Sequence, residues 1–210
     1  MRSWMMRAAL VPFLVAVAGC LSPRGEAPPV HTYQLSLDGW AGEVRPPDVN
    51  GLVLLVGPPQ SHPGFETPRI IYLKRPYELE SYSVNQWADS PARLFAPLLV
   101  QALGQTGTWR AVVLLPNSVR GDYRLESSAF AVQQEFMQQP SRVRVTVRTQ
   151  LVDMKESRIV SSRSFDVTED APSEDAYGGV LAANRATAKL LDHIGSWLQA
   201  CVRHQPECGR

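Results

Sequence analysis

The chain has no marked excess of charge of either sign. Its 210 residues include 21 Lys and Arg against 20 Asp and Glu, a formal net charge of +1. Proteins that bind nucleic acids normally carry a strongly basic face, so this balance argues against such a partner. Cysteine is scarce as well: the sequence has three cysteines and no CxxC pair, which excludes the usual cysteine-rich zinc sites.

The sequence also lacks the motifs that mark common enzyme classes. It contains no GxSxG, no HExxH and no GxxxxGK[ST], which mark serine hydrolases, zinc proteases and phosphate-binding loops. The segment GPPQSHPG has glycines but no GK[ST] ending, and we interpret it as a loop. The histidines include no pair four residues apart that could grip a metal; they are His31, His62, His193 and His204. We therefore expect a protein without enzymatic activity, metal or cofactor.

The apolar run near the start is too short for an ordinary membrane-spanning helix. Residues 8–19 are uncharged, whereas the bilayer core requires about 20 apolar residues. Arg2 and Arg7 precede the run and small residues end it, as in an export signal. The tetrad VAGC at residues 17–20 resembles the lipobox of bacterial lipoproteins, in which a branched residue and two small ones precede a cysteine.

The lipobox resemblance implies that residues 1–19 are a signal peptide and that Cys20 carries a lipid. In bacterial lipoproteins this thiol receives a diacylglycerol and the new amine is acylated, and two or more acyl chains hold a protein stably on a membrane. Leu21 stands where lipoproteins retained at the inner membrane commonly have aspartate. The resemblance therefore implies an outer-membrane anchor facing the periplasm. The alternative is an ordinary secretory signal in which the cysteine is incidental.

Composition divides the exported chain into a tether, one domain and a tail. Residues 20–30 contain three prolines, a glycine and few apolar side chains, which is typical of an extended tether. Residues 31–201 are predicted to form one domain, because 44% apolar content is enough for a packed core. Residues 202–210 form a short tail.

Two cysteines remain once Cys20 is assigned to the lipid. Cys201 and Cys208 lie close together in the sequence, and the compartment reached by export is oxidising, so they tend to pair. A disulfide there would pin the tail onto the preceding helix. The alternative is a metal site made by these two residues and His204.

Strand patterns alternate with two helical patterns along the domain. Apolar alternation or continuous apolar runs predict strands at residues 31–37, 51–57, 69–73, 123–136, 141–153 and 158–167. A helix is predicted from Pro91, capped by Ser90 and ended by Gly104 and Gly107. An apolar stripe predicts a second helix over residues 174–201. The elements predict a single α/β domain, with a mixed or largely antiparallel sheet covered on one face by two helices.

Several segments occur in the order seen in a known family. YELESYSVNQWADSPARLFAPLLVQAL, residues 77–103, resembles the central block of the ABC-type transport auxiliary lipoproteins, the family of paraquat-inducible protein C. In that block a strand leads into a Trp, an Asp-x-Pro helix start and a long apolar helix. RIIYL, DYRLESSAFAVQQEF, LVDMKESRIVSSRSF and AANRATAKLLDHIGSWL match the other strands and the closing helix. The resemblance covers most of residues 31–198, and the tail with its cysteines departs from it.

The family resemblance implies a role and no reaction. Members are similar to lipoproteins that work with an inner-membrane ABC permease, its ATPase and an MCE-domain protein, in systems thought to move phospholipid or other hydrophobic molecules between two membranes. We therefore predict a non-enzymatic auxiliary component held on the membrane by Cys20, and leave self-association open. The alternative is a periplasmic carrier domain that itself holds an acyl chain between helices and sheet.

Two aromatic residues are the candidate partner contacts. Phe65 lies in PPQSHPGFETP, residues 58–68, which is long for a link between two apolar strands. Trp87 comes just before the cap of the first predicted helix. Three arginines also share one face of a predicted strand: Arg142, Arg144 and Arg148. We interpret them as a solvent-facing stripe balanced by acidic neighbours, the alternative being a surface that grips lipid phosphates.

Overall fold

The structure, a computed structural model, describes residues 28–38 and 44–209. The predicted signal, Cys20 and most of the tether lie outside the described residues. The elements, in chain order, are β1 (His31–Tyr33), β2 (Leu52–Val56), β3 (Arg69–Leu73), β4 (Glu80–Trp87), α1 (Pro91–Gln105), β5 (Trp109–Leu114), β6 (Tyr123–Glu135), β7 (Arg142–Asp153), β8 (Arg158–Asp170), α2 (Ala176–Val202) and the short 3₁₀ helix η2 (Pro206–Gly209).

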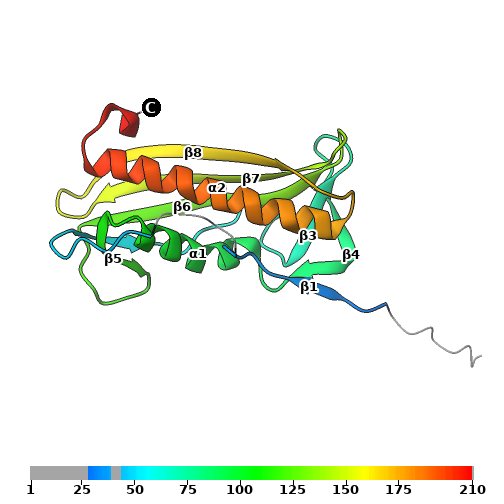
Figure 1. The fold of residues 1–210 in the computed structure, drawn as a ribbon, viewed down its shortest axis with the longest axis horizontal. Helices are drawn as coiled ribbons and strands as arrows, with labels where there is room; N and C mark the ends of the chain where they lie inside the picture. Colours follow the sequence, from blue (N-terminus) through cyan, green and yellow to red (C-terminus); the bar gives the residue numbers. More distant parts are fainter. Residues whose placement is uncertain (1–27, 39–43, 210) are drawn as a thin grey trace, which may run out of the picture.

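The eight strands form one mixed sheet, and both α helices lie on the same face of it (Figure 1). The order runs β1-β4-β3-β6-β2-β5, and β7 and β8 continue from the other edge of β6. The long strands β6, β7 and β8 pair as an antiparallel meander, whereas β2 and β3 run parallel to β6. The predicted α/β fold with two helices on one face is confirmed. In the part of the chain that the structure describes, no helix is both long and apolar enough to cross a membrane.

Local patterns predicted most elements but not all of them. The meander and the second helix fall within a few residues of their predicted bounds. Strand β5 was not predicted, β4 was implied only by the family resemblance, and the strand expected over residues 31–37 ends at Tyr33. Ser90 was expected to cap α1, but its side chain makes no capping bond within the described residues. α2, in contrast, begins after Asp175, whose Oδ1 accepts a hydrogen bond from the backbone N–H of Gly178 at 2.7 Å.

The segment between β2 and β3 follows the edge of β6. The N–H of Gln60 donates to the carbonyl of Ser127 at 2.9 Å, and the N–H of Phe130 donates to the carbonyl of Gln60 at 3.0 Å. The N–H of His62 donates to the carbonyl of Phe130 at 2.9 Å. Residues 57–68 are therefore tied to the sheet by backbone hydrogen bonds and are not a free-standing loop.

Side chains fill the space between the helices and the sheet. β7 alternates as predicted, with Val143, Val145 and Val147 turned to the helices and buried. The rings of Phe95 in α1 and Phe130 in β6 stack at 4.4 Å between centroids. The predicted stripe of α2 is buried throughout: Ala183, Thr187, Leu190, Leu191, Ile194, Trp197, Leu198 and Cys201. The layer where the carrier alternative would place an acyl chain is thus occupied by a continuous core.

Candidate functional site

Cys201 and Cys208 are joined by a disulfide with 4.5 Å between their Cα atoms. Cys201 is buried on α2. The carbonyl of Cys208 accepts hydrogen bonds from Ser161 Oγ at 2.6 Å and from Trp197 Nε1 at 3.3 Å. The tail is thereby held against β8 and α2. Both thiols are used in the bridge, and within residues 28–38 and 44–209 no group of three His, Cys, Asp or Glu side chains could hold a metal ion.

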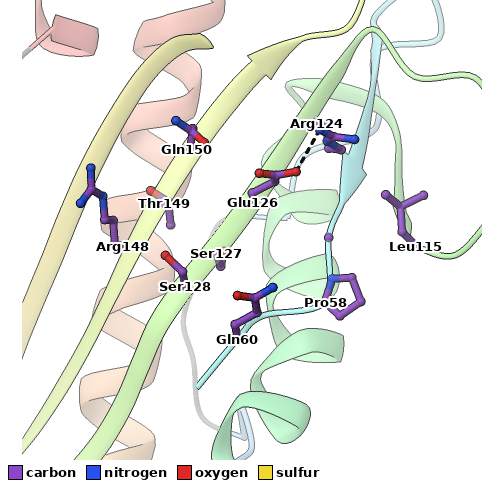
Figure 2. Close-up of a pocket in the computed structure, with 11 residues that line it drawn as sticks. Pro58, Gln60, Leu115, Arg124, Glu126, Ser127, Ser128, Arg148, Thr149 and Gln150 are labelled. Atoms are coloured by element: carbon purple, nitrogen blue, oxygen red, sulfur yellow. Dashed lines mark ion pairs between the residues drawn. The ribbon is translucent and has the colours of Figure 1, made fainter. Parts of the chain in front are cut away.

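A hollow of about 460 Å³ lies on the side of the sheet away from the helices (Figure 2). It forms where the chain leaves β2 and turns past the middle of β6. The residues that line it are Gly57, Pro58, Gln60, Leu115, Arg124, Glu126, Ser127, Ser128, Arg148, Thr149 and Gln150. They come from four segments far apart in the sequence: the β2–β3 connection, the end of β5, β6 and β7. The helix-free face is therefore recessed at its centre.

The charges around the hollow are only partly neutralised. Arg124 Nη2 lies 2.9 Å from Glu126 Oε1, and both side chains are about half exposed or less. Arg148 is exposed on the neighbouring strand β7, across the hollow from this pair, and forms no ion pair or hydrogen bond with any described side chain (Figure 2). One positive charge is thus left over at the hollow.

The predicted arginine stripe is divided by its neighbours on β8. Arg144 Nε donates to both carboxylate oxygens of Asp166, at 2.9 and 3.0 Å. This hydrogen bonding raises the pKa of Arg144 above its ordinary value. Arg142 and Arg144 share one face with Arg148, as predicted, but the structure shows an acidic partner for Arg144 and none for Arg148 within the described chain.

The structure buries both predicted contact residues, which is a correction. Phe65 is 6% exposed and packs in a small cluster with Ile71, Leu73 and Ala131. Trp87 is 2% exposed and belongs to the main core. Each ring is covered because its backbone follows the sheet, so neither can offer its face to a partner. The β2–β3 connection exposes other residues to solvent, among them His62 and Glu66.

The two acidic residues near the start of β4 pair with close neighbours. Glu80 Oε2 accepts from the Tyr72 hydroxyl at 2.8 Å and lies 3.4 Å from Lys74 Nζ. The hydrogen bond from Tyr72 lowers the pKa of the Glu80 carboxyl. Glu78 pairs with Arg75, three residues before it. Both carboxylates therefore serve the β3–β4 turn.

The hollow is lined mainly by polar side chains. Its lining contains hydroxyls and amides beside the Arg148 guanidinium, but no His or Cys among the lining residues that could activate Ser127 or Ser128 as a nucleophile. Guanidinium and amide groups donate hydrogen bonds to carboxylates and to backbone carbonyls. Sequence patterns did not indicate this hollow, because its walls meet only through the pairing of β6 with β2 and β7.

Comparison with known proteins finds a family and a shared fold. The family described as "ABC-type transport auxiliary lipoprotein component" matches residues 33–195. The crystal structure of a protein from Xanthomonas campestris aligns with a TM-score of 0.72 at 22% identity, covering 83% of this chain and 98% of that one. A hypothetical protein from Chlamydia trachomatis aligns with a TM-score of 0.51 at 9% identity, covering 74% of this chain and 99% of that one. No curated protein matches this chain. At these identities the two structures show the fold alone.

Proposed function

Because the chain belongs to the family of ABC-type transport auxiliary lipoprotein components, we propose that it is a lipid-anchored, non-enzymatic subunit of such a system. In this proposal it works from the periplasmic side of the outer membrane, with an MCE-domain protein and an inner-membrane ABC permease and its ATPase. The observation that carries the proposal is the family match, which spans residues 33–195 and so nearly the whole folded domain.

The anchor in this proposal is Cys20, and the tether sets how far the domain can move from it. The lipobox-like tetrad VAGC ends at this residue, and the first strand begins at His31. An extended chain spans at most about 3.5 Å per residue, so this stretch reaches roughly 40 Å. The domain therefore stays close to the membrane that holds its lipid, and a partner rooted in the other membrane has to extend to it.

We propose the helix-free face as the surface that receives the MCE-domain protein. The helices cover the other face, and the hollow beside Arg148 carries one positive charge without a partner among the described residues. A carboxylate on an extended segment of the partner would neutralise it. Complementary charge of this kind mainly sets the rate and the specificity of association.

The proposal is tested by capture from envelopes after mild cross-linking, with the tagged full-length protein expressed from its own signal. The native protein should enrich the permease, the ATPase and the MCE-domain protein, and Arg148→Glu should weaken that enrichment. Arg93→Glu is the control for the same change in charge on the helical face, because Arg93 is exposed on α1; unlike Arg148, it has an acidic partner, Asp89, 3.2 Å away. Equal capture by the two variants would remove the helix-free face as the docking surface.

Two other results would overturn the function itself. If the native protein enriches no transporter component, the auxiliary role is wrong. If the purified protein carries phospholipid in equal molar amount, the carrier alternative is favoured, and the packed core between helices and sheet would have to open to hold it.

A further inference from the structure

The turn between β3 and β4 displays an aromatic side chain that is fully exposed. Tyr77 is 101% exposed, and Leu79 beside it is 48% exposed. The turn is braced below them: Arg75 Nη2 donates to Glu78 Oε1 at 3.0 Å, and the Tyr72 hydroxyl donates to Glu80 at 2.8 Å. Tyr77 is therefore presented on an ordered turn.

The backbone of Tyr77 is in a conformation that bulky residues seldom adopt. Its φ is 68°, in the left-handed region where glycine, asparagine or aspartate is the usual residue. Such outliers cluster at sites with a function, because a turn that needed only to reverse the chain would favour a small residue. The strain and the full exposure of the ring together point to a contact made by this side chain.

A third exposed apolar residue lies at the same end of the sheet. The N–H of Phe136, just after β6, donates to the carbonyl of Leu73 at the end of β3 at 2.8 Å. The turn that follows β6 therefore lies beside the β3–β4 turn, and it exposes Met137 by 46%. Tyr77, Leu79 and Met137 together are named here the tip.

The described end of the tether, residues 28–30, leaves the domain toward the tip. β1 pairs in parallel with β4, with His31 opposite Asn85, so the chain before His31 points to the end at which β4 begins. β4 begins at Glu80, directly after the tip. In Figure 1 the segment before β1 leaves on the right, the side on which β3 and β4 are labelled, and the C terminus lies on the left. Residues 28–30 thus leave the domain at the end that carries the tip.

We infer that the tip inserts into the headgroup region of the bilayer that holds the lipid of Cys20, as a second membrane contact. The inference rests on the proposed lipid anchor. Tyrosine suits this position because its ring is apolar and its hydroxyl stays hydrated at the interface. A weak contact is sufficient, because the anchor and the short tether keep the tip at a high effective concentration beside the surface.

The charges at the tip indicate that the contact is apolar. The two cations of the turn are already paired, Lys74 with Glu80 and Arg75 with Glu78. The tip therefore offers no net positive charge from this turn to anionic lipid. Insertion is expected to occur on vesicles of phosphatidylcholine alone and to persist when salt is added.

The test uses a fluorescent reporter on the full-length lipidated protein, reconstituted in phosphatidylcholine vesicles that contain nitroxide-labelled phosphatidylcholine. In the proposed lipoprotein the thiol of Cys20 carries the lipid, and Cys201 and Cys208 form a disulfide, so an added cysteine is the free thiol. Gln138→Cys places an environment-sensitive label beside Met137 and leaves the tip intact. Lys155→Cys places it in the exposed β7–β8 turn, at the opposite end of the sheet.

The inference predicts that emission of the label at position 138 shifts to the blue and is quenched, while the label at position 155 shows neither change. When Tyr77→Asp is added to the variant labelled at position 138, the blue shift and the quenching of that label should both disappear. The fold should survive this change, because the side chain is fully exposed and aspartate tolerates the left-handed backbone. A thermal melt equal to that of the parent checks this.

Three results overturn the inference. If neither the label at position 138 nor the label at position 155 shifts to the blue or is quenched, the tip stays in water. A label at position 138 that becomes shielded only when solubilised envelope proteins are added shows that the tip binds a protein. If Tyr77→Asp leaves the blue shift and quenching at position 138 unchanged, Tyr77 does not make the contact, which contradicts the inference. In each case an acylated N-terminal peptide, found by mass spectrometry, leaves the proposed anchor standing, whereas an unmodified Cys20 removes the anchor and the inference together.

Discussion

Gly179 of α2 lies directly against the side-chain amide of Gln134 in β6: a Cβ built on this glycine would stand 2.3 Å from Oε1 of the glutamine. Gln134 is 2% exposed and cannot move freely. Its Oε1 accepts from the Tyr82 hydroxyl at 3.0 Å, and its Nε2 donates to Ser141 Oγ at 3.0 Å. The glycine lets the first turns of α2 sit on the sheet while this buried network stays satisfied.

Gly179→Ala is expected to lower the free energy of unfolding by about 1–3 kcal/mol, because the methyl group either overpacks the contact or displaces Gln134 from its partners. This range is the net loss, after the gain of about 1 kcal/mol that alanine brings to a helix. Chemical denaturation measures it. Gly195→Ala is the control in the same helix, because its nearest neighbour would be Thr106 Cγ2 at an ordinary 3.4 Å. Equal stability of the two variants would contradict the role of Gly179.

The cap of α2 is expected to make stability depend on pH. The hydrogen bond from the Gly178 N–H, with a smaller contribution from Ser173, lowers the pKa of Asp175. A carboxyl whose pKa is lower in the folded state stabilises the fold above its unfolded pKa, near 3.9, and loses that contribution as pH falls through the folded pKa.

Asp175→Ala should therefore lower the free energy of unfolding by about 1 kcal/mol at neutral pH, the usual value for a lost helix cap. Asp175→Asn should lose less, because asparagine also caps. The difference in free energy of unfolding between the native protein and Asp175→Asn should become smaller as the pH is lowered below about 4. A difference that stays constant from pH 7 to pH 3 would show that the ionised carboxylate contributes nothing.

The disulfide is expected to hold the tail without holding the domain together. It closes a loop with a sequence separation of 7, and such a short loop contributes less than about 3 kcal/mol. Arg203 is exposed between the two cysteines. Brief trypsin treatment of the oxidised protein should cut there without releasing residues 204–210, and the reduced protein should release them while the domain stays intact. Release from the oxidised protein would show that the bridge is absent.

The sequence predicts the elements whose patterns are local. The alternation of Val143, Val145 and Val147 with polar residues is sufficient to predict β7 and its buried face. β5 was missed although its segment AVVL is a continuous apolar run like that of β2, beside which it lies at the sheet edge. α2 begins at Ala176, two residues after the predicted start at residue 174, which shows that a helix start is uncertain by a residue or two where several acidic residues adjoin.

The site depends on contacts between distant segments, which local patterns cannot show. Phe65 was expected to be an exposed contact residue because its segment is rich in turn residues. Backbone hydrogen bonds between this segment and β6 instead bring Phe65 onto the sheet. Arg144 and Arg148 are equivalent in the sequence pattern, but only the register of β7 with β8 places Asp166 beside Arg144. The unpaired charge at the hollow therefore became visible only in three dimensions.

The most direct test of the account is the mass of the N-terminal peptide of the full-length protein, expressed from its own signal and recovered from separated membranes. We expect a peptide that begins at Cys20 and carries two or three acyl chains, in the outer-membrane fraction, with Cys20→Ala as the control that leaves the membrane. An unmodified, soluble periplasmic protein would contradict the lipid anchor and, with it, the proposed auxiliary role at the membrane.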